Sequence, residues 1–125
     1  MDQSTLVSSG HALVSAMDEA GFGPRLAMWV HNTDSDTWKL WLVPPKGTSD
    51  EAAFYRKMVE IVSGNRDKLG TMDAGDTKMV PETHPVARGI GGFIKLPGLG
   101  AAYFSGNVFY GFYLPDGIIL RSDLR

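Results

Sequence analysis

Hydrophobic residues recur at helical spacing near the start of the chain. Between Ser4 and Ala20, apolar side chains return every three or four positions until Gly21-Phe22-Gly23-Pro24 interrupts them. This spacing predicts an amphipathic helix over residues 4–20 that ends at the glycines. Gly10 falls on its apolar face, where the missing side chain allows another part of the chain to approach closely. The apolar face consists of Leu6, Leu13, Val14, Met17 and Ala20.

Two runs of β-forming residues follow, over residues 25–32 and 37–43, with turn-forming residues at 33–36. They predict a hairpin in which His31 lies opposite Trp38. Alternation places large apolar side chains on both faces, which is typical of an interior strand pair or of a sheet face that binds a partner. One face carries Leu26, Met28, Val30, Trp41 and Val43, and the other carries Trp29, Trp38, Leu40 and Leu42.

A second amphipathic run begins after the capping-box pattern Thr48-Ser49-Asp50-Glu51 and extends to Leu69. It predicts a helix that stops at Gly70. Gly64 lies inside this run and costs about 1 kcal/mol relative to alanine, so we expect an interruption there. The apolar face consists of Phe54, Met58, Ile61, Val62 and Leu69.

The middle of the chain has weaker signals. Residues 77–82 predict a short strand after a loop at 71–76. Residues 84–94 have helical apolar spacing with Pro85 at a permitted first-turn position, but three glycines weaken the helix. We therefore expect a short helix followed by a loop over residues 96–100.

The last quarter of the chain predicts a three-stranded meander over residues 101–120. Ser105-Gly106-Asn107 and Pro115-Asp116-Gly117 supply the residues that tight hairpin turns require, and aromatic and β-branched side chains fill the runs between them. These turns would place Phe104 opposite Phe109 and Leu114 opposite Ile119. One face would then carry Tyr103, Tyr110, Phe112, Leu114 and Ile119, and the other Phe104, Phe109, Tyr113 and Leu120.

The order of these elements predicts an α+β fold over residues 1–125. We expect a single two-layer domain whose mostly antiparallel sheet contains the N-terminal hairpin, the short middle strand and the C-terminal meander. Two main helices and one short helix would pack on one face of this sheet. A chain of 125 residues is long enough to bury one hydrophobic core.

Composition narrows the possible chemistry. The chain has no cysteine, which excludes disulfides, thiol catalysis and cysteine-ligated metals. A formal net charge of -2 argues against nucleic acid as the partner. The chain shows neither a signal-peptide pattern nor a membrane-length apolar run, so we expect a cytoplasmic protein with no membrane contact. No metal and no cofactor is expected.

A glycine-rich segment over residues 88–100 is the first candidate ligand site. Free backbone N–H groups at Gly91 and Gly92, together with the cations Arg88 and Lys95, are what a phosphate-binding loop needs. His84 would be the candidate base in such a site. The segment departs from known phosphate-loop patterns, and we favour the interpretation that its glycines allow close packing.

Other candidate residues are explained more simply by structure. Asp76-Thr77-Lys78 matches part of a metal-dependent nuclease pattern, but three residues are a weak signal. Asp34 and Asp36 are turn formers at a hairpin tip and offer few ligands for a cation. The three histidines, His11, His31 and His84, have no metal-ligand spacing.

The remaining feature is an excess of apolar side chains on the predicted strands. It favours a non-enzymatic interaction or accessory module that binds a protein partner, or a second copy of itself, through an aromatic sheet face or edge. A nucleotide- or phosphometabolite-binding domain is the alternative, and a nuclease is a third. The candidate partner-binding residues are Tyr103, Tyr110, Phe112, Trp29 and Trp38.

Overall fold

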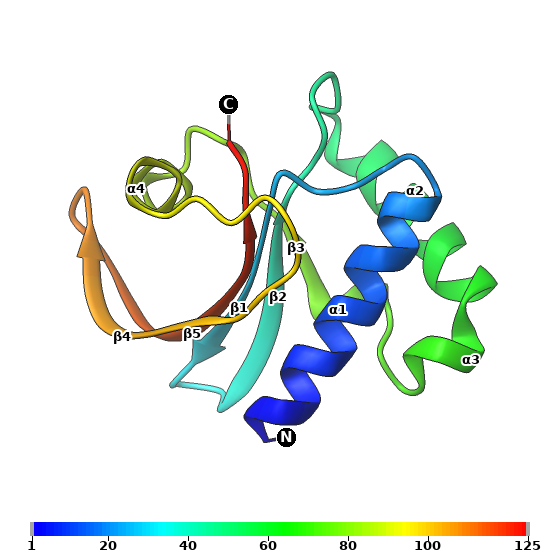
Figure 1. The fold of residues 1–125 in the computed structure, drawn as a ribbon, viewed down its shortest axis with the longest axis horizontal. Coiled ribbons are helices and arrows are strands. Elements are labelled where there is room, and N and C mark those ends of the chain that lie inside the picture. The colour runs from blue at the N-terminus through cyan, green and yellow to red at the C-terminus, as the bar shows by residue number, and fades with distance from the viewer. Residues whose placement is uncertain (1, 125) are drawn as a thin grey trace.

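A five-stranded sheet forms the centre of the molecule (Figure 1). The computed structural model describes residues 2–124. The strand order is β3-β2-β1-β5-β4, and only the β2–β3 pair is parallel, so the predicted α+β fold with a mostly antiparallel sheet is confirmed. The strands are β1 (Leu26–Asn32), β2 (Thr37–Val43), β3 (Thr77–Met79), β4 (Ala102–Phe109) and β5 (Phe112–Ser122).

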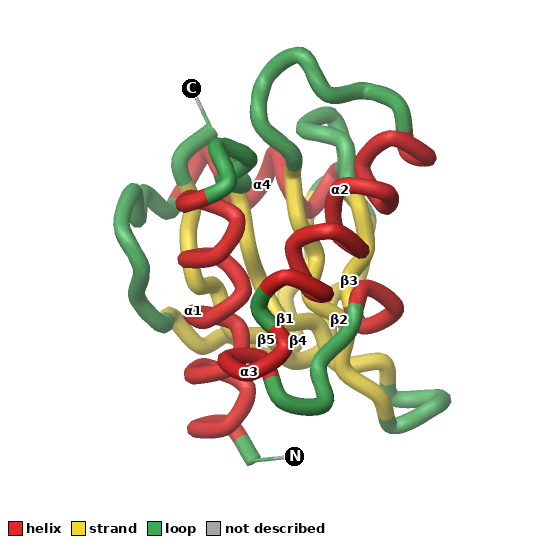
Figure 2. The backbone as a smooth tube through the Cα atoms, turned by 90° about the vertical axis from the view of Figure 1, so that its right-hand side faces the viewer, coloured by secondary structure: helices red, strands yellow, loops and turns green. Residues whose placement is uncertain are grey.

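Helices cover both faces of this sheet. Three of them, α1 (Gln3–Glu19), α2 (Glu51–Gly64) and α3 (Arg66–Leu69), lie on one face, as Figure 2 shows, and α4 (Pro85–Phe93) lies on the other (Figure 1). The sequence predicted all helices on one face. The difference follows from the β1–β2 hairpin, whose two faces are both apolar as predicted, because each face needs a cover.

The β1–β2 hairpin has the predicted register, with His31 opposite Trp38 and Trp29 opposite Leu40. The Trp29 indole Nε1–H donates a 2.6 Å hydrogen bond to the backbone carbonyl of Leu6, which ties β1 to α1. Gly10 of α1 makes this contact possible, because a Cβ there would lie 2.8 Å from Trp29 Nε1. The predicted close approach at Gly10 is confirmed, although side chains rather than backbone make it.

The helix ends show which residues cap them. Asp50 is the N-cap of α2 and accepts a hydrogen bond from the Ala52 N–H at 3.0 Å, so the helix begins after Asp50 rather than at Thr48. The predicted interruption after Gly64 is confirmed, since the short helix α3 follows at residue 66. A single 3₁₀ turn, η1 (Ala74–Asp76), then leads into β3.

The C-terminal segment forms one long hairpin instead of the predicted three-stranded meander. Its two-residue turn is Tyr110-Gly111, with φ angles of 49° and 83°, as a type I′ turn requires. Both predicted turns lie inside strands: Phe104 pairs with Gly117, and Leu114 pairs with Asn107. At Gly117 the Phe104 ring occupies the space of a side chain, because a Cβ there would collide with this ring.

The β4–β5 hairpin bends away from the rest of the sheet and curls toward α4 (Figure 1). The β1–β5 pairing ends at Val30 and Gly117, whereas β4 and β5 stay paired as far as the turn. Pro115 has no N–H and cannot extend the ladder toward β1. Gly106, at the same level of the hairpin, adopts a φ of 63°. The bend brings the start of β5 back over the face that α4 covers.

Candidate functional site

Strand β4 lies at an edge of the sheet, and no strand within residues 2–124 pairs with its outer side. Its eight residues, Ala-Tyr-Phe-Ser-Gly-Asn-Val-Phe, include no charged side chain and no proline. Edge strands are usually protected by charges, proline or a covering segment, because unpaired backbone groups can bind another strand. This edge therefore has the chemistry of a strand-binding surface.

Aromatic and apolar side chains are exposed on the hairpin face that points away from α4. Tyr103 is 57% exposed, Val108 64% and Tyr113 61%, and Val108 lies opposite Tyr113 across the two strands. Between them, Ser105 Oγ donates a 2.6 Å hydrogen bond to Asp116. Exposed apolar groups beside an open edge are typical of protein-binding surfaces.

The turn of the hairpin carries a third exposed aromatic ring. Tyr110 is a bulky residue at positive φ, a backbone conformation that such residues rarely adopt. The guanidinium carbon of Arg88 in α4 lies 5.0 Å from the centre of the Tyr110 ring. This cation–π contact joins the tip of the hairpin to α4.

Three rings from separate elements meet beneath the curled hairpin. Trp41 of β2, His84 at the start of α4 and Phe112 of β5 have ring centres between 5.0 and 6.3 Å apart, all in edge-on arrangements. On β3, Lys78 places its ammonium 4.8 Å from the centre of the Trp41 ring. The cluster thus combines aromatic rings with one positioned cation.

His84 serves as the N-cap of α4. Its Nδ1 accepts a 3.1 Å hydrogen bond from the Val86 N–H, so the ring has a structural role as a helix cap. Burial lowers the pKa of His84 below its ordinary value of 6.5, and the positive charge of Lys78 lowers it further. Glu82, the acidic residue two positions before His84, is paired with Arg25 at 2.8 Å. The His84 ring is therefore neutral at pH 7.

A groove of about 650 Å³ lies where β5 departs from β1, and we call it the inter-hairpin groove. Its lining combines apolar rings with two lysines, Lys39 and Lys78. Such a volume and such a mixture of groups are typical of small-molecule sites. The lining residues are Val30, His31, Asn32, Thr33, Asp34, Lys39, Trp41, Tyr55, Thr77, Lys78, Phe112, Tyr113, Leu114 and Pro115.

The five predicted partner-binding residues lie in different surroundings. Tyr103 and Tyr110 are exposed, and Phe112 is 38% exposed at the inter-hairpin groove. Trp38 is half-buried with its ring centre 4.8 Å from that of His31. Trp29 is only 2% exposed, so its side chain belongs to the core and takes no part in a surface.

The glycine-rich segment divides between a helix and a loop. Gly91 and Gly92 lie in the second half of α4, where helical N–H groups bond to carbonyls four residues earlier, so they form no free cradle. Together with Arg88 they border a hollow of about 320 Å³ that Glu82 also lines, and Lys95 is not among its lining residues. Close packing is evident at Gly89, where a Cβ would collide with the Phe109 side chain.

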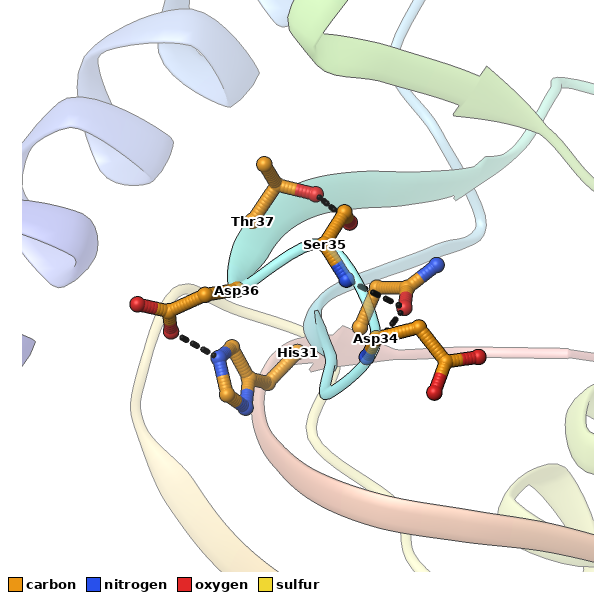
Figure 3. Close-up of polar contacts among 6 residues, drawn as sticks. His31, Asp34, Ser35, Asp36 and Thr37 are labelled. Atoms are coloured by element: carbon orange, nitrogen blue, oxygen red, sulfur yellow. Dashed lines mark hydrogen bonds and ion pairs between the residues drawn. The ribbon is translucent and has the colours of Figure 1, made fainter.

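The tip of the β1–β2 hairpin is held by its own polar side chains (Figure 3). Asp36 forms a 2.8 Å contact with His31 Nε2, and the side-chain oxygen of Asn32 accepts hydrogen bonds from the backbone N–H groups of Asp34 and Ser35. Turn formation therefore accounts for these residues, as the sequence favoured.

The Asp76 and Lys78 side chains have separate structural partners. The Asp76 carboxylate accepts a 3.0 Å hydrogen bond from the Asp73 N–H as part of a capping box on η1. Lys78 lies over Trp41. Within residues 2–124, no three histidine or acidic side chains are grouped so that they could hold a metal ion.

Comparison with known proteins adds no family to this description: no protein-family model, curated protein or solved structure matches the chain. None of the helices within residues 2–124 combines the length and apolar character needed to cross a lipid bilayer.

Sequence reasoning missed several residues of these surfaces. Val108 was not identified because the sequence predicted a turn at residues 105–107. A turn at Tyr110-Gly111 would have placed Val108 opposite Tyr113. The groove residues Trp41 and Lys78 are neighbours only because β3 pairs in parallel with β2. No local pattern could have indicated that pairing, because 36 residues separate β2 from the matching positions of β3 in a crossover through α2.

Proposed function

We propose that this chain is a non-enzymatic protein-interaction module that binds an extended strand of a partner, or of a second copy, along β4. The observation that carries the proposal is the open, uncharged edge of β4. In strand addition, backbone hydrogen bonds supply affinity and alternate side chains supply specificity. The cytoplasmic location expected from the sequence is part of this proposal.

The exposed face of the hairpin supports the same function. A strand added beside β4 would continue the sheet, and its side chains would lie next to Tyr103 and Val108. Both side chains would lose water contact on binding, which stabilises a complex in proportion to the apolar area covered. The positive φ of Gly106 bends β4, which shapes this edge and limits which partner strands fit along it.

Two exposed valines allow a matched test. Val108→Lys puts a charge on β4, and Val59→Lys makes the same change on the exposed face of α2, where the valine is 53% exposed. We expect Val108→Lys to weaken self-association, or binding of a captured partner, at least tenfold while Val59→Lys leaves it unchanged. Sedimentation velocity over a concentration series measures self-association, and titration with the purified partner measures hetero-association.

Two results would overturn the proposal. One is a wild-type protein that stays monomeric at every concentration and yields no saturable partner. The other is binding that Val108→Lys and Val59→Lys weaken equally, since the open edge would then not be the contact surface.

A further inference from the structure

The geometry points to a second site: the inter-hairpin groove binds a small planar aromatic carboxylate, with its ring against Phe112 and its carboxylate at Lys78. This site lies where β5 departs from β1, apart from the free edge of β4, and does not depend on the proposed function. The groove offers an accessible ring, a positioned cation and space between them.

Phe112 provides the ring surface. It is 38% exposed and lines the groove, and its ring packs edge-on against Trp41 and His84, which restrict its movement. Aromatic rings pair with their centres about 4.5–7 Å apart, which stabilises a bound ring beyond the area it covers. An aromatic ligand is therefore preferred over an aliphatic one of equal size.

Lys78 provides the charge. Its ammonium sits 4.8 Å from the centre of the Trp41 ring, and no ion pair within the described residues involves it. The contact with Trp41 restricts where the long side chain can place its charge, so less conformational entropy is lost when an anion binds. Lys39 also lines the groove and adds positive charge, although its ammonium donates to the Gly75 carbonyl.

The distance between the Lys78 ammonium and the Phe112 ring limits the size of the ligand. The Lys78 ammonium lies 4.8 Å from the Trp41 ring centre and the Phe112 ring centre lies 6.3 Å from it, so at most about 11 Å separates them. A ring about 5 Å from Phe112 with a carboxylate within about 4 Å of the ammonium spans such a distance. The groove volume of about 650 Å³ accepts one or two fused rings.

The charges that face the groove favour an anion. Lys39 and Lys78 are opposed by Asp34 at the hairpin tip, and the contact of His31 with Asp36 is internal to that tip. The lining is thus locally positive in a chain whose formal net charge is -2. His84 adds no charge at pH 7, because its pKa is lowered by burial and by Lys78.

The test uses 2-naphthoate and its uncharged counterpart 2-naphthamide as probes, with binding followed by isothermal titration calorimetry and amide NMR shifts. We expect 2-naphthoate to bind at least tenfold more tightly than 2-naphthamide, because a charge-assisted contact is lost in the amide. Lys78→Met should remove that tenfold preference, and Phe112→Leu should weaken both probes. Lys95→Met changes an exposed lysine outside the groove, so it should alter neither the preference for 2-naphthoate nor the affinity for either probe.

Each contrary result would overturn the inference. These results are no saturable binding of 2-naphthoate, equal affinity for acid and amide, or a preference that survives in Lys78→Met. Circular dichroism and the melting temperature identify a variant that fails to fold. In that case Lys78→Gln, which also removes the charge, replaces Lys78→Met in the comparison.

Discussion

Gly89 and Gly92 lie three residues apart in α4 but have opposite surroundings. A Cβ at Gly89 would collide with the Phe109 side chain of β4, whereas a Cβ at Gly92 would have no neighbour within 4 Å. The first glycine is needed for close packing of helix and hairpin, and the second only adds backbone freedom to the unfolded chain. The same residue type thus has two different energetic effects in one helix.

Alanine substitutions should separate these effects. Gly89→Ala is expected to lower the free energy of unfolding by about 1 kcal/mol, since overpacking costs roughly 1–3 kcal/mol and the gain in helix propensity is about 0.5–1 kcal/mol. Gly92→Ala should raise it by about 0.5–1 kcal/mol. Urea unfolding measures both, and Phe109→Leu should recover part of the Gly89→Ala loss. Equal effects at the two positions would contradict the packing role of Gly89.

Among the elements, the β4–β5 hairpin shows most clearly how turn chemistry and strand length compete. Tyr110 occupies a positive-φ turn position that asparagine or glycine fits better. The alternative turns at residues 105–107 and 115–117 have better turn residues, yet they would cut the segment into three short strands. The long pairing is favoured because Ala102 to Phe109 stay paired with β5 on both sides of Gly106, and because Gly117 faces the Phe104 ring.

Replacement of Tyr110 tests the balance at this turn. Tyr110→Asn relieves a backbone cost of about 1–2 kcal/mol and loses a cation–π contact with Arg88 of about 0.5–1 kcal/mol. We expect a net rise in the free energy of unfolding of about 0.5 kcal/mol, measured by thermal and urea unfolding. Arg88→Met serves as the reference, because it removes the cation alone. A destabilised Tyr110→Asn protein would show that the ring contributes more than the turn conformation costs.

Local patterns predicted most of the elements, and long-range pairing decided the rest. The register of the β1–β2 hairpin followed from its symmetric turn, and the break after Gly64 followed from the low helix propensity of glycine. The apolar residues on both faces of the β1–β2 hairpin indicated that each face needs a cover, but the assignment of α4 to its face depends on long-range contacts such as that of Phe109 with Gly89. The inter-hairpin groove was equally hidden, since the bend of β5 at Pro115 creates it.

At the scale of the whole molecule, His84 lies at the junction between the central sheet and the curled β4–β5 hairpin. Its ring contacts Trp41 from the central sheet and Phe112 from the curled hairpin, and it caps α4 through the Val86 N–H. Protonation would place a charge inside this junction beside Lys78, and it would also remove the acceptor that caps the helix. The junction is therefore sensitive to acid.

Stability should accordingly fall at acidic pH. The folded-state pKa of His84 is lowered, so the unfolded chain binds the proton more readily and the free energy of unfolding decreases as pH drops below 6.5. His84→Asn keeps a capping side chain but has no group that titrates in this range. Urea unfolding across about pH 5 to 7.5 should show a steeper loss for wild type than for His84→Asn. Parallel profiles would show that His84 is not the group responsible.

The pairing of β1 with β5 has a consequence for how the protein is made. Leu26 of β1 pairs with Ser122 of β5, 96 positions later in the chain. During synthesis β1 and β2 leave the ribosome early, but the inner edge of β1 has no partner until β5 emerges. A nascent chain therefore carries an apolar strand with one open edge until β5 has been synthesised, and the central sheet closes only then.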